Sequence, residues 1–330
     1  VLPDSQRGHR TLDPIESLEI LSSGPLTTVQ DLGRYGFGRY GVPPSGALDS
    51  FSLRAANLLV GNPEGEAGLE ITLMGLKVRF LADLVVALCG GDLQPHLNEK
   101  PFEMWRSQFA RKGDTLFLKA PKTGCRAYLA VGGGLSIEPA LGSKSTNLAS
   151  KFGGYEGRAL RKGDILFSKP PELHLQNTGK SLAPYGRPLY TGDWTLRALF
   201  GPQHQDFEEE SKRVFVDSPF TVSTHSDRTG IRLSGPALQR EKSLGDSIIS
   251  EGIAPGAVQV PGDGQPIILL VETITGGYRK IATVISADLP LLGQIKPGDR
   301  VRFRKTSVQE AIAALRERET FINRLKKEPG

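Results

Sequence analysis

The chain has 330 residues, too many for one small core, which predicts one large domain or two of medium size. Hydrophobic residues make up 38% and charged residues 23%, an ordinary balance for a soluble globular protein. The net charge of +5 is mild and spread along the chain, apart from a basic end at Arg324, Lys326 and Lys327. Because no basic stripe with interleaved aromatic residues occurs, the sequence argues against a nucleic-acid-binding protein.

Cysteine and histidine usage predicts no metal centre. Cys89 and Cys125 each lie in an apolar, strand-like run, so we expect two buried free thiols in a cytosolic protein. The 5 histidines form no HxxxH or HExxH pattern. No apolar run is long enough to span a membrane, and the N-terminal VLPDSQRGHRTLDPIE has no hydrophobic core. We therefore expect a cytoplasmic protein with neither a membrane span nor a secretory signal.

The predicted elements divide the chain into two β-rich halves. The 39 glycines and 23 prolines favour short strands joined by turns, so the fold is expected to be mainly β with a few helices. Residues 1–14 are expected to form a disordered tail, and residues 15–168 a first β unit around one helix. Residues 169–188 carry prolines and turn formers but few aliphatic residues, which predicts a linker. Residues 189–330 would form a second β unit with a C-terminal helix.

The helix of the first half follows a distinctive turn, YGVPPSG. Its proline pair fixes the backbone, and Gly46 allows angles that a residue with a Cβ resists. Asp49 suits an N-cap and Gly61 a C-terminal cap, which predicts a helix over about residues 50–60. The turn has two interpretations. It is either a rigid lead into a packed helix or a binding turn in which Ser45 and Gly46 hold a ligand.

One short phrase recurs in both halves, as RKGDTLF (111–117), RKGDILF (161–167) and KPGDRVRF (296–303). The Gly-Asp pair predicts a turn and the alternation after it a strand. The simplest interpretation is a structural one, in which the phrase forms the turn of a hairpin at the edge of a barrel. The recurrence of the phrase in both halves suggests two related β units. At the C-terminal helix, Ser307 and Glu310 form a capping box. Its apolar face is expected to comprise Val308, Ile312, Leu315 and Ile322.

Several turns carry polar groups that suit a small-molecule site on a β scaffold. GSKST (142–146) lacks the glycine spacing of a P-loop, which is excluded. HSDRTGIRLSG offers Arg228 as a fork for a carboxylate or phosphate, although Asp227 beside it can pair with neighbours instead. SEGIAPGAVQV supplies Glu251 and Gln259, and ETITGGYRK supplies paired glycines that let a ligand approach the backbone.

These motifs together resemble one family. The stretches TTVQDLGRYG, VPPSGALDSFSLRAANLLVGN, LEIT, GCRAYLAVGGGL, LGSKSTN, SDRTGIRLSGP, SEGIAPGAVQVPGDGQPI, TGGY and PGDRVRF are similar, in this order, to those of the KipA family. Members of that family are also described as C subunits of 5-oxoprolinase, as allophanate hydrolase subunit 2 or as biotin-dependent carboxyltransferase proteins. The resemblance runs from about Leu18 to Phe303. It implies two cyclophilin-like barrel units in tandem.

The resemblance also implies an activity. The partners would be two further proteins, a KipI-type B subunit with a separate A subunit. The complex would hydrolyse 5-oxoproline to glutamate with ATP, which the partners would hold or share. Two alternatives stay open. One is a carboxyltransferase component that moves CO2 from carboxybiotin to urea or a related amide, with no biotin on this chain. The other is a regulator that binds KipI without catalysis.

The resemblance implies that the polar turns described above form one catalytic and substrate-binding site. Arg228 would bind a carboxylate or phosphate, and Glu251 would act as acid or base. The family pattern D-x-Q-T-T-G-G-Y-P reads VETITGGYRK here, one residue shorter and without the Gln and Pro, so the chain lacks an amide at this place. The residues expected to bind substrate are Ser45, Gly46, Asp49, Arg54, Ser226, Asp227, Gln259, Thr275, Gly276, Gly277 and Tyr278.

Overall fold

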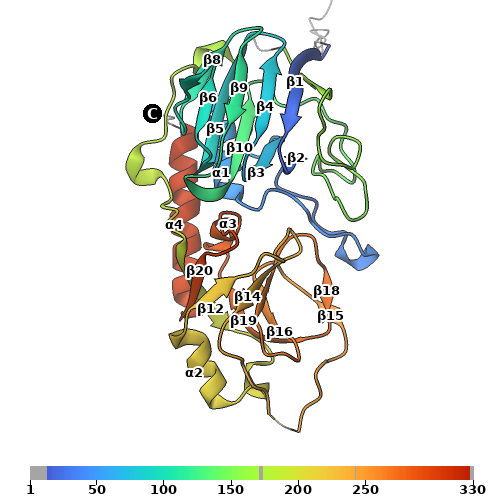
Figure 1. Cartoon of the computed structure of the whole chain (residues 1–330), viewed down its shortest axis with the longest axis vertical. Helices are drawn as coiled ribbons and strands as arrows, with labels where there is room; N and C mark the ends of the chain where they lie inside the picture. The colour runs from blue at the N-terminus through green and yellow to red at the C-terminus, as the bar shows by residue number, and fades with distance from the viewer. Residues whose placement is uncertain (1–12, 171–173, 242, 328–330) are drawn as a thin grey trace, which may run out of the picture.

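The computed structural model describes residues 13–170, 174–241 and 243–327. Most of the predicted tail, residues 1–12, and residues 171–173 of the predicted linker lie outside the described residues. The chain forms two β-rich units, and α4 (Val308–Lys327) runs along one side of both (Figure 1). The mainly β prediction is confirmed. Among the described helices, none is long and apolar enough to cross a membrane.

The first unit consists of two antiparallel sheets that enclose one core. The six-stranded sheet has the order β11 (Ile165–Ser168), β1 (Ile15–Ser23), β4 (Leu76–Phe80), β9 (Thr115–Leu118), β6 (Pro95–Leu97) and β7 (Lys100–Pro101). The five-stranded sheet has the order β2 (Leu26–Gln30), β3 (Gly68–Thr72), β10 (Thr123–Val131), β5 (Leu84–Asp92) and β8 (Ser107–Ala110).

Strand β5 is buried on both faces, which explains its unbroken apolar sequence LVVALCGG. Val86 and Leu88 point into the core between the two sheets. Val85, Ala87 and Cys89 point the other way, toward α1 (Ser50–Leu59) and the second unit. Period-two alternation thus gives one strand two apolar neighbours.

The second unit is a closed barrel. Its order is β12 (Asp193–Phe200), β19 (Arg279–Val284), β16 (Ala257–Val260), β17 (Ile267–Leu269), β14 (Gly230–Ser234), β13 (Phe220–Val222) and β20 (Arg300–Lys305), and parallel pairing of β20 with β12 closes it. Against β20 packs α2 (Glu209–Asp217), where Phe215 stacks on Phe303 with ring centres 4.3 Å apart. A separate ribbon pairs β15 (Glu251–Gly252) with β18 (Thr275–Gly276).

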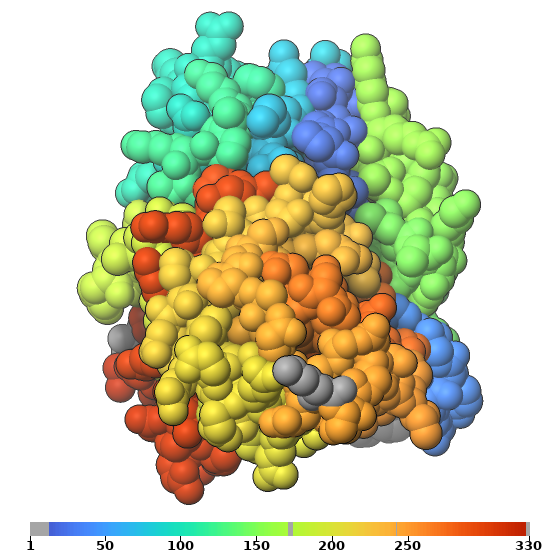
Figure 2. All heavy atoms as spheres, turned by 60° about the horizontal axis from the view of Figure 1, so that its bottom comes forward, coloured from blue at the N-terminus to red at the C-terminus, as the bar shows by residue number. Residues whose placement is uncertain are grey.

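Short helices complete the fold. They are α3 (Leu289–Leu292) and the 3-10 turns η1 (Gly38–Tyr40), η2 (Leu175–Asn177), η3 (Pro184–Gly186) and η4 (His204–Asp206). Viewed from the barrel end, the yellow and orange barrel lies directly against the first unit (Figure 2).

The recurring Gly-Asp phrase forms the same turn three times. Each glycine has a positive φ, and each aspartate accepts a hydrogen bond from the backbone N–H three residues earlier. The acceptors are Asp114, Asp164 and Asp299, at 2.8, 2.7 and 3.1 Å. The strands β9, β11 and β20 begin directly after these turns, as predicted.

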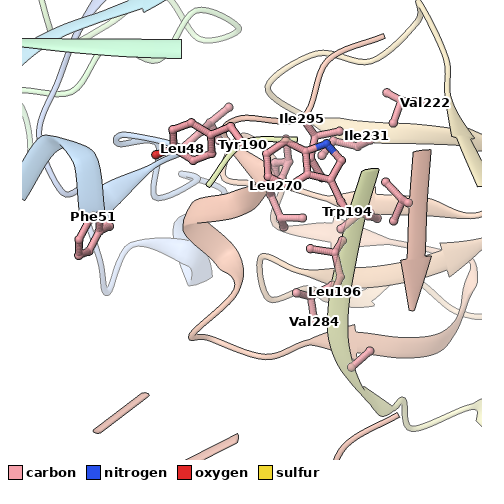
Figure 3. Close-up of a cluster of buried hydrophobic side chains, with 14 of the residues drawn as sticks. Leu48, Phe51, Tyr190, Trp194, Leu196, Val222, Ile231, Leu270, Val284 and Ile295 are labelled. Carbon is pink, nitrogen blue, oxygen red and sulfur yellow. The ribbon is translucent and has the colours of Figure 1, made fainter. Parts of the chain in front are cut away.

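The two units share one hydrophobic core. Leu48 and Phe51 from the first unit belong to the same buried cluster as Trp194 and Leu196 of the barrel, with Tyr190 between them (Figure 3). Because burying apolar surface is the main stabilising term in folding, the units are held together as one body.

The capping box of α4 is confirmed: the Ser307 N–H donates to Glu310 at 2.8 Å, and the Glu310 N–H donates to the Ser307 hydroxyl at 3.2 Å. The predicted apolar face is partly wrong. Val308 and Ile312 are 55% and 45% exposed, since the first half of the helix extends past the core. Ile322 and Leu325, near its C-terminal end, are the buried residues of the helix.

Candidate functional site

The Ser45-Gly46 turn lies where the two units meet. Ser45 has φ +54°, in the left-handed region that few residues with a Cβ occupy, and Gly46 has φ +91°. A Cβ on Gly46 would lie 2.8 Å from the backbone nitrogen of Gly33, so a larger residue does not fit. The Ser45 N–H donates to the Val271 carbonyl at 3.0 Å. Strained backbone that is held from both sides is typical of a ligand-binding turn.

Arg228 lies behind this turn and is only 5% exposed. Its Nη2 donates to the Gly46 carbonyl at 2.7 Å and to Glu272 at 3.1 Å, and its Nε donates to Glu272 at 3.2 Å. Its Nη1 donates to Glu70. Each guanidinium nitrogen therefore has an acceptor inside the protein. A ligand carboxylate or phosphate would reach Arg228 only by displacing one of them.

Glu70 and Glu272 bring two carboxyl groups to this one arginine. Glu70 also accepts from the Tyr128 hydroxyl at 2.8 Å and lies 3.6 Å from the Arg126 guanidinium. Burial acts to raise the pKa of Glu70, but Arg228 and Arg126 outweigh it and the net pKa is lowered. Burial raises the pKa of Glu272, and Arg228 offsets this only in part. Glu272 is therefore the carboxyl group that takes up a proton first as the pH falls.

Asn147 completes this group from the GSKSTN loop. Its Nδ2 donates to the Ser45 hydroxyl at 3.0 Å and to Glu272 at 2.8 Å. Asp31 holds the loop, because it accepts from the Lys144 backbone N–H at 2.6 Å. We name this set the junction cluster: Ser45, Gly46, Glu70, Asn147, Arg228 and Glu272.

Asp49 is the N-cap of α1, as predicted, and accepts from the Ser52 N–H at 2.9 Å. Its carboxylate also accepts from Gln294 at 2.7 Å and from the Tyr190 hydroxyl at 3.2 Å. Its own N–H donates to the Tyr128 hydroxyl at 2.8 Å, which connects it to Glu70. Burial raises the pKa of Asp49, although these hydrogen bonds act to lower it.

Asp49→Ala should lower the free energy of unfolding by about 2–4 kcal/mol, because the cap is lost and three buried side-chain donors, on Ser52, Tyr190 and Gln294, lose their acceptor. Asp49→Asn keeps a capping oxygen and should cost less than half as much. The pKa of Asp49 is higher in the folded state than its unfolded value of about 4, so between these two pKa values the folded state binds more protons than the unfolded state. The free energy of unfolding should therefore fall as the pH rises from about 4 through the folded pKa. The asparagine variant should lack this fall. Urea unfolding of both variants at several pH values measures this, and equal losses for both would contradict it.

Arg54 points away from the predicted site. Its guanidinium binds Glu319 of α4 through two hydrogen bonds of 2.7 Å and Glu64 through one of 2.8 Å. Among the described residues, its hydrogen bonds and ion pairs go to Glu64 and Glu319 and to none of the other predicted site residues. It joins α1 to α4.

A second polar group lies at the β15–β18 ribbon. Glu251 pairs with Gly276 across the ribbon and accepts from Gln203 at 2.7 Å. Glu251 also accepts from Lys280, and this hydrogen bond is the main cause that lowers the pKa of Glu251. The side chain of Glu251 is 42% exposed, whereas that of Lys280 is 8% exposed. Of the two predicted roles, acid or base, an ionised and accessible carboxylate suits a base.

Gln259, Gly276 and Tyr278 belong to the same group. A Cβ on Gly276 would lie 2.5 Å from Nε2 of Gln259, so the ribbon and β16 approach closely only because glycine stands there. Gln259 Nε2 donates to the Tyr278 carbonyl at 3.2 Å. Tyr278 also lines a neighbouring cavity of about 330 Å³, whose other walls come mainly from β14, β17 and the turn before β17 and from no other residue of this group. We name this set the rim cluster: Gln203, Glu251, Gln259, Thr275, Gly276, Gly277, Tyr278 and Lys280.

Ser226 and Asp227 shape their own turn. Asp227 accepts from the N–H groups of Thr229 and Gly230 at 2.7 and 3.1 Å, and the Ser226 hydroxyl accepts from the Arg232 N–H at 3.0 Å. Among the described residues, the side-chain hydrogen bonds of both residues stay within this turn and with β14, and none reaches the junction cluster or the rim cluster. Their turn fixes the place from which Arg228 enters the protein.

Residues 271–278 connect the two clusters, and they include the segment that departs from the family pattern. The Val271 carbonyl and the Glu272 side chain belong to the junction side. Thr275 and Gly276 pair with Gly252 and Glu251 on the rim side. A change in this segment therefore reaches both clusters.

Sequence reasoning missed the partners of the predicted residues. Glu70 and Asn147 lie in LEIT and LGSKSTN, which resemble the family, whereas Glu272 and Lys280 flank TGGY in the segment that departs from the family pattern. A glutamate inside the apolar strand GLEIT was a usable signal, because a buried charge needs a partner.

Comparison with known proteins shows the family. Residues 40–305 match the family model "Carboxyltransferase domain, subdomain A and B". The 5-oxoprolinase C subunit of Escherichia coli (strain K12) is 40% identical over 93% of this chain and 97% of its own length. The corresponding protein of Haemophilus influenzae is 37% identical over 94% of this chain and 98% of its own length. The predicted resemblance is confirmed.

Among solved structures, the urea carboxylase of Kluyveromyces lactis superposes with a TM-score of 0.88 at 33% identity. The match covers 96% of this chain and 30% of that protein, so this chain is similar to one part of that urea carboxylase. The urea amidolyase of the same organism gives the same TM-score, with 20% of its chain covered. The chain belongs to the family of carboxyltransferase domains, subdomains A and B.

Proposed function

We propose that this chain is the C subunit of an ATP-dependent 5-oxoprolinase, which converts 5-oxoproline, ATP and water to glutamate, ADP and phosphate. The observation that carries the proposal is the match to the C subunits of two 5-oxoprolinases over nearly the full length of both partners. The chain would act in the cytoplasm with a KipI-like B subunit, together with an A subunit, and would have no activity alone.

The rim cluster and the junction cluster would have different roles in this reaction. An unstrained lactam resists hydrolysis until its carbonyl is activated, and ATP would supply that activation in the complex. The rim cluster would receive the substrate, with Glu251 as the base for the attacking water and the glycine N–H groups of 275–278 as donors to a developing oxyanion. The junction cluster would fix residues 271–278 in place through Glu272 and Asn147.

The test is glutamate release from 5-oxoproline and ATP by the host's two partner proteins, with and without this chain. Release that needs this chain is expected. If the two partners are folded and bind this chain but release no glutamate, the proposal is wrong. In that case tight binding without turnover would indicate the regulatory alternative.

Carboxyl transfer is the second candidate, favoured by the TM-score of 0.88 with the urea carboxylase. In that reaction a carboxybiotin carried by another chain would visit the rim cluster. Transfer of labelled CO2 from carboxybiotin to urea by the complex would support it, and requires a biotin carrier domain on a neighbouring chain.

A further inference from the structure

The cavity of about 330 Å³ beside Tyr278 adjoins the rim cluster. Its walls come mainly from β14, β17 and the turn between β16 and β17. Its size lies at the lower end of the range of pockets that hold small molecules. Because Tyr278 belongs to the rim cluster and also lines this cavity, a ligand in the cavity would contact the rim cluster.

Strand pairing places the cavity and the rim cluster on the same face of the barrel. Consecutive antiparallel pairings form a row in the order Arg232, Ile267, Gln259 and Lys280. Directly paired residues project their side chains from one face of a sheet. The row faces away from the barrel core, because the residues next to it along each strand are core residues, namely Ile231, Ile268, Val258 and Ile281. Arg232 therefore lies two strands from Gln259, roughly 10 Å at the backbone.

Arg232 is the cation that lines the cavity, and it is exposed on β14. Among the described residues, no carboxylate pairs with it and no acceptor takes a hydrogen bond from its guanidinium. The carboxylate that also lines the cavity, on Asp263, accepts from the Gln265 N–H at 3.0 Å instead. The Ser234 and Tyr278 hydroxyls line the cavity too, and neither donates to an acceptor within the described part of the chain. Three donors, one of them charged, are therefore available to an anion.

Arg232 differs in this respect from Arg228, the residue that the sequence offered for a carboxylate. Each guanidinium nitrogen of Arg228 already has an acceptor inside the protein. Apolar side chains form much of the remaining wall of the cavity, namely those of Leu233, Pro261, Pro266 and Ile267. A charged contact against such a wall is less screened by water than one on an open surface, and it is correspondingly stronger.

We infer that Arg232 binds the carboxylate of the substrate in this cavity. In 5-oxoproline the carboxylate and the lactam carbonyl lie on opposite sides of the ring nitrogen. A molecule with its carboxylate at Arg232 and its ring against Tyr278 would direct its carbonyl toward the rim cluster, where Glu251 would act. The inference rests on the proposed function and adds the residue that recognises the substrate.

The experiment measures KM and kcat for glutamate release from 5-oxoproline by the reconstituted complex. Arg232→Gln removes the charge, Arg232→Lys keeps it and Arg232→Glu reverses it. Arg304→Gln is the matched control, because Arg304 is an exposed arginine of β20 in the same barrel and does not line the cavity. Unfolding temperatures check that each variant is folded.

In Arg232→Gln the KM for 5-oxoproline should rise about 10–100-fold while kcat changes less than about threefold. The rise should be smaller in Arg232→Lys and larger in Arg232→Glu, and Arg304→Gln should leave both constants unchanged. An unchanged KM in Arg232→Gln would overturn the inference and leave the proposed function standing. Equal effects of the three Arg232 variants would also overturn it, since a structural role does not follow charge. A wild-type complex that releases no glutamate would overturn the proposed function and this inference with it.

Discussion

Arg228→Ala is expected to lower the free energy of unfolding by about 3–5 kcal/mol, because Glu70 and Glu272 would stay buried without their shared cation. For a chain of 330 residues, 1 kcal/mol corresponds to about 1.4 °C, so the unfolding temperature should fall by about 4–7 °C. The group is 5% exposed and bonded at every nitrogen, so solvent screening does not reduce the effect. Arg232→Ala is the control, since Arg232 is an exposed arginine on the strand that follows. A loss within about 1 kcal/mol would contradict the role assigned to the junction cluster.

Turnover of the reconstituted complex should also disappear in Arg228→Ala. A double variant distinguishes a loss of turnover caused by loss of folding from a loss of a functional group. Arg228→Met with Glu272→Gln removes a positive and a negative group together, so much of the stability should return. If turnover returns with it, Arg228 only supports the fold. If stability returns and turnover does not, Arg228 or Glu272 has a role in turnover beyond its contribution to the fold, and the single variant Glu272→Gln shows which of the two it is.

The strands and the first helix were predictable because their signals are local. Alternation, the Gly-Asp turns and the Asp49 cap each act within a few residues. The buried face of α4 was not predictable in this way, because Val308 and Ile312 follow the same helical spacing as Ile322 and yet are exposed. Only the position of the shared core decides which end of that helix is covered.

The site was predictable in part for the same reason. Arg228, Glu251 and the TGGY turn were found as motifs, but the partners of Arg228 lie 158 and 44 residues away, at Glu70 and Glu272. Pairing over such distances depends on how the two units meet, which no local pattern encodes. The functional role of each candidate residue stays a prediction.

Glu251→Gln is expected to reduce turnover of the reconstituted complex by about 10²–10⁴-fold, the usual range for removal of a general base. Glutamine keeps an oxygen that can accept from Lys280 and Gln203, so the β15–β18 ribbon should stay in place. Glu210→Gln is the matched control, an exposed glutamate of α2 in the same unit. Unchanged turnover in Glu251→Gln would exclude a base at this position.

Lys280→Met tests the same residue by its pH dependence. The hydrogen bond from Lys280 is the main cause of the lowered pKa of Glu251, so its removal should raise that pKa. A base works only when deprotonated, and the rate falls as the pH drops through its pKa. The acidic limb of the pH–rate profile should therefore move to higher pH in Lys280→Met, while the rate at high pH is reduced less. A limb that keeps its position would show that Glu251 does not set the rate, even if Glu251→Gln is inactive.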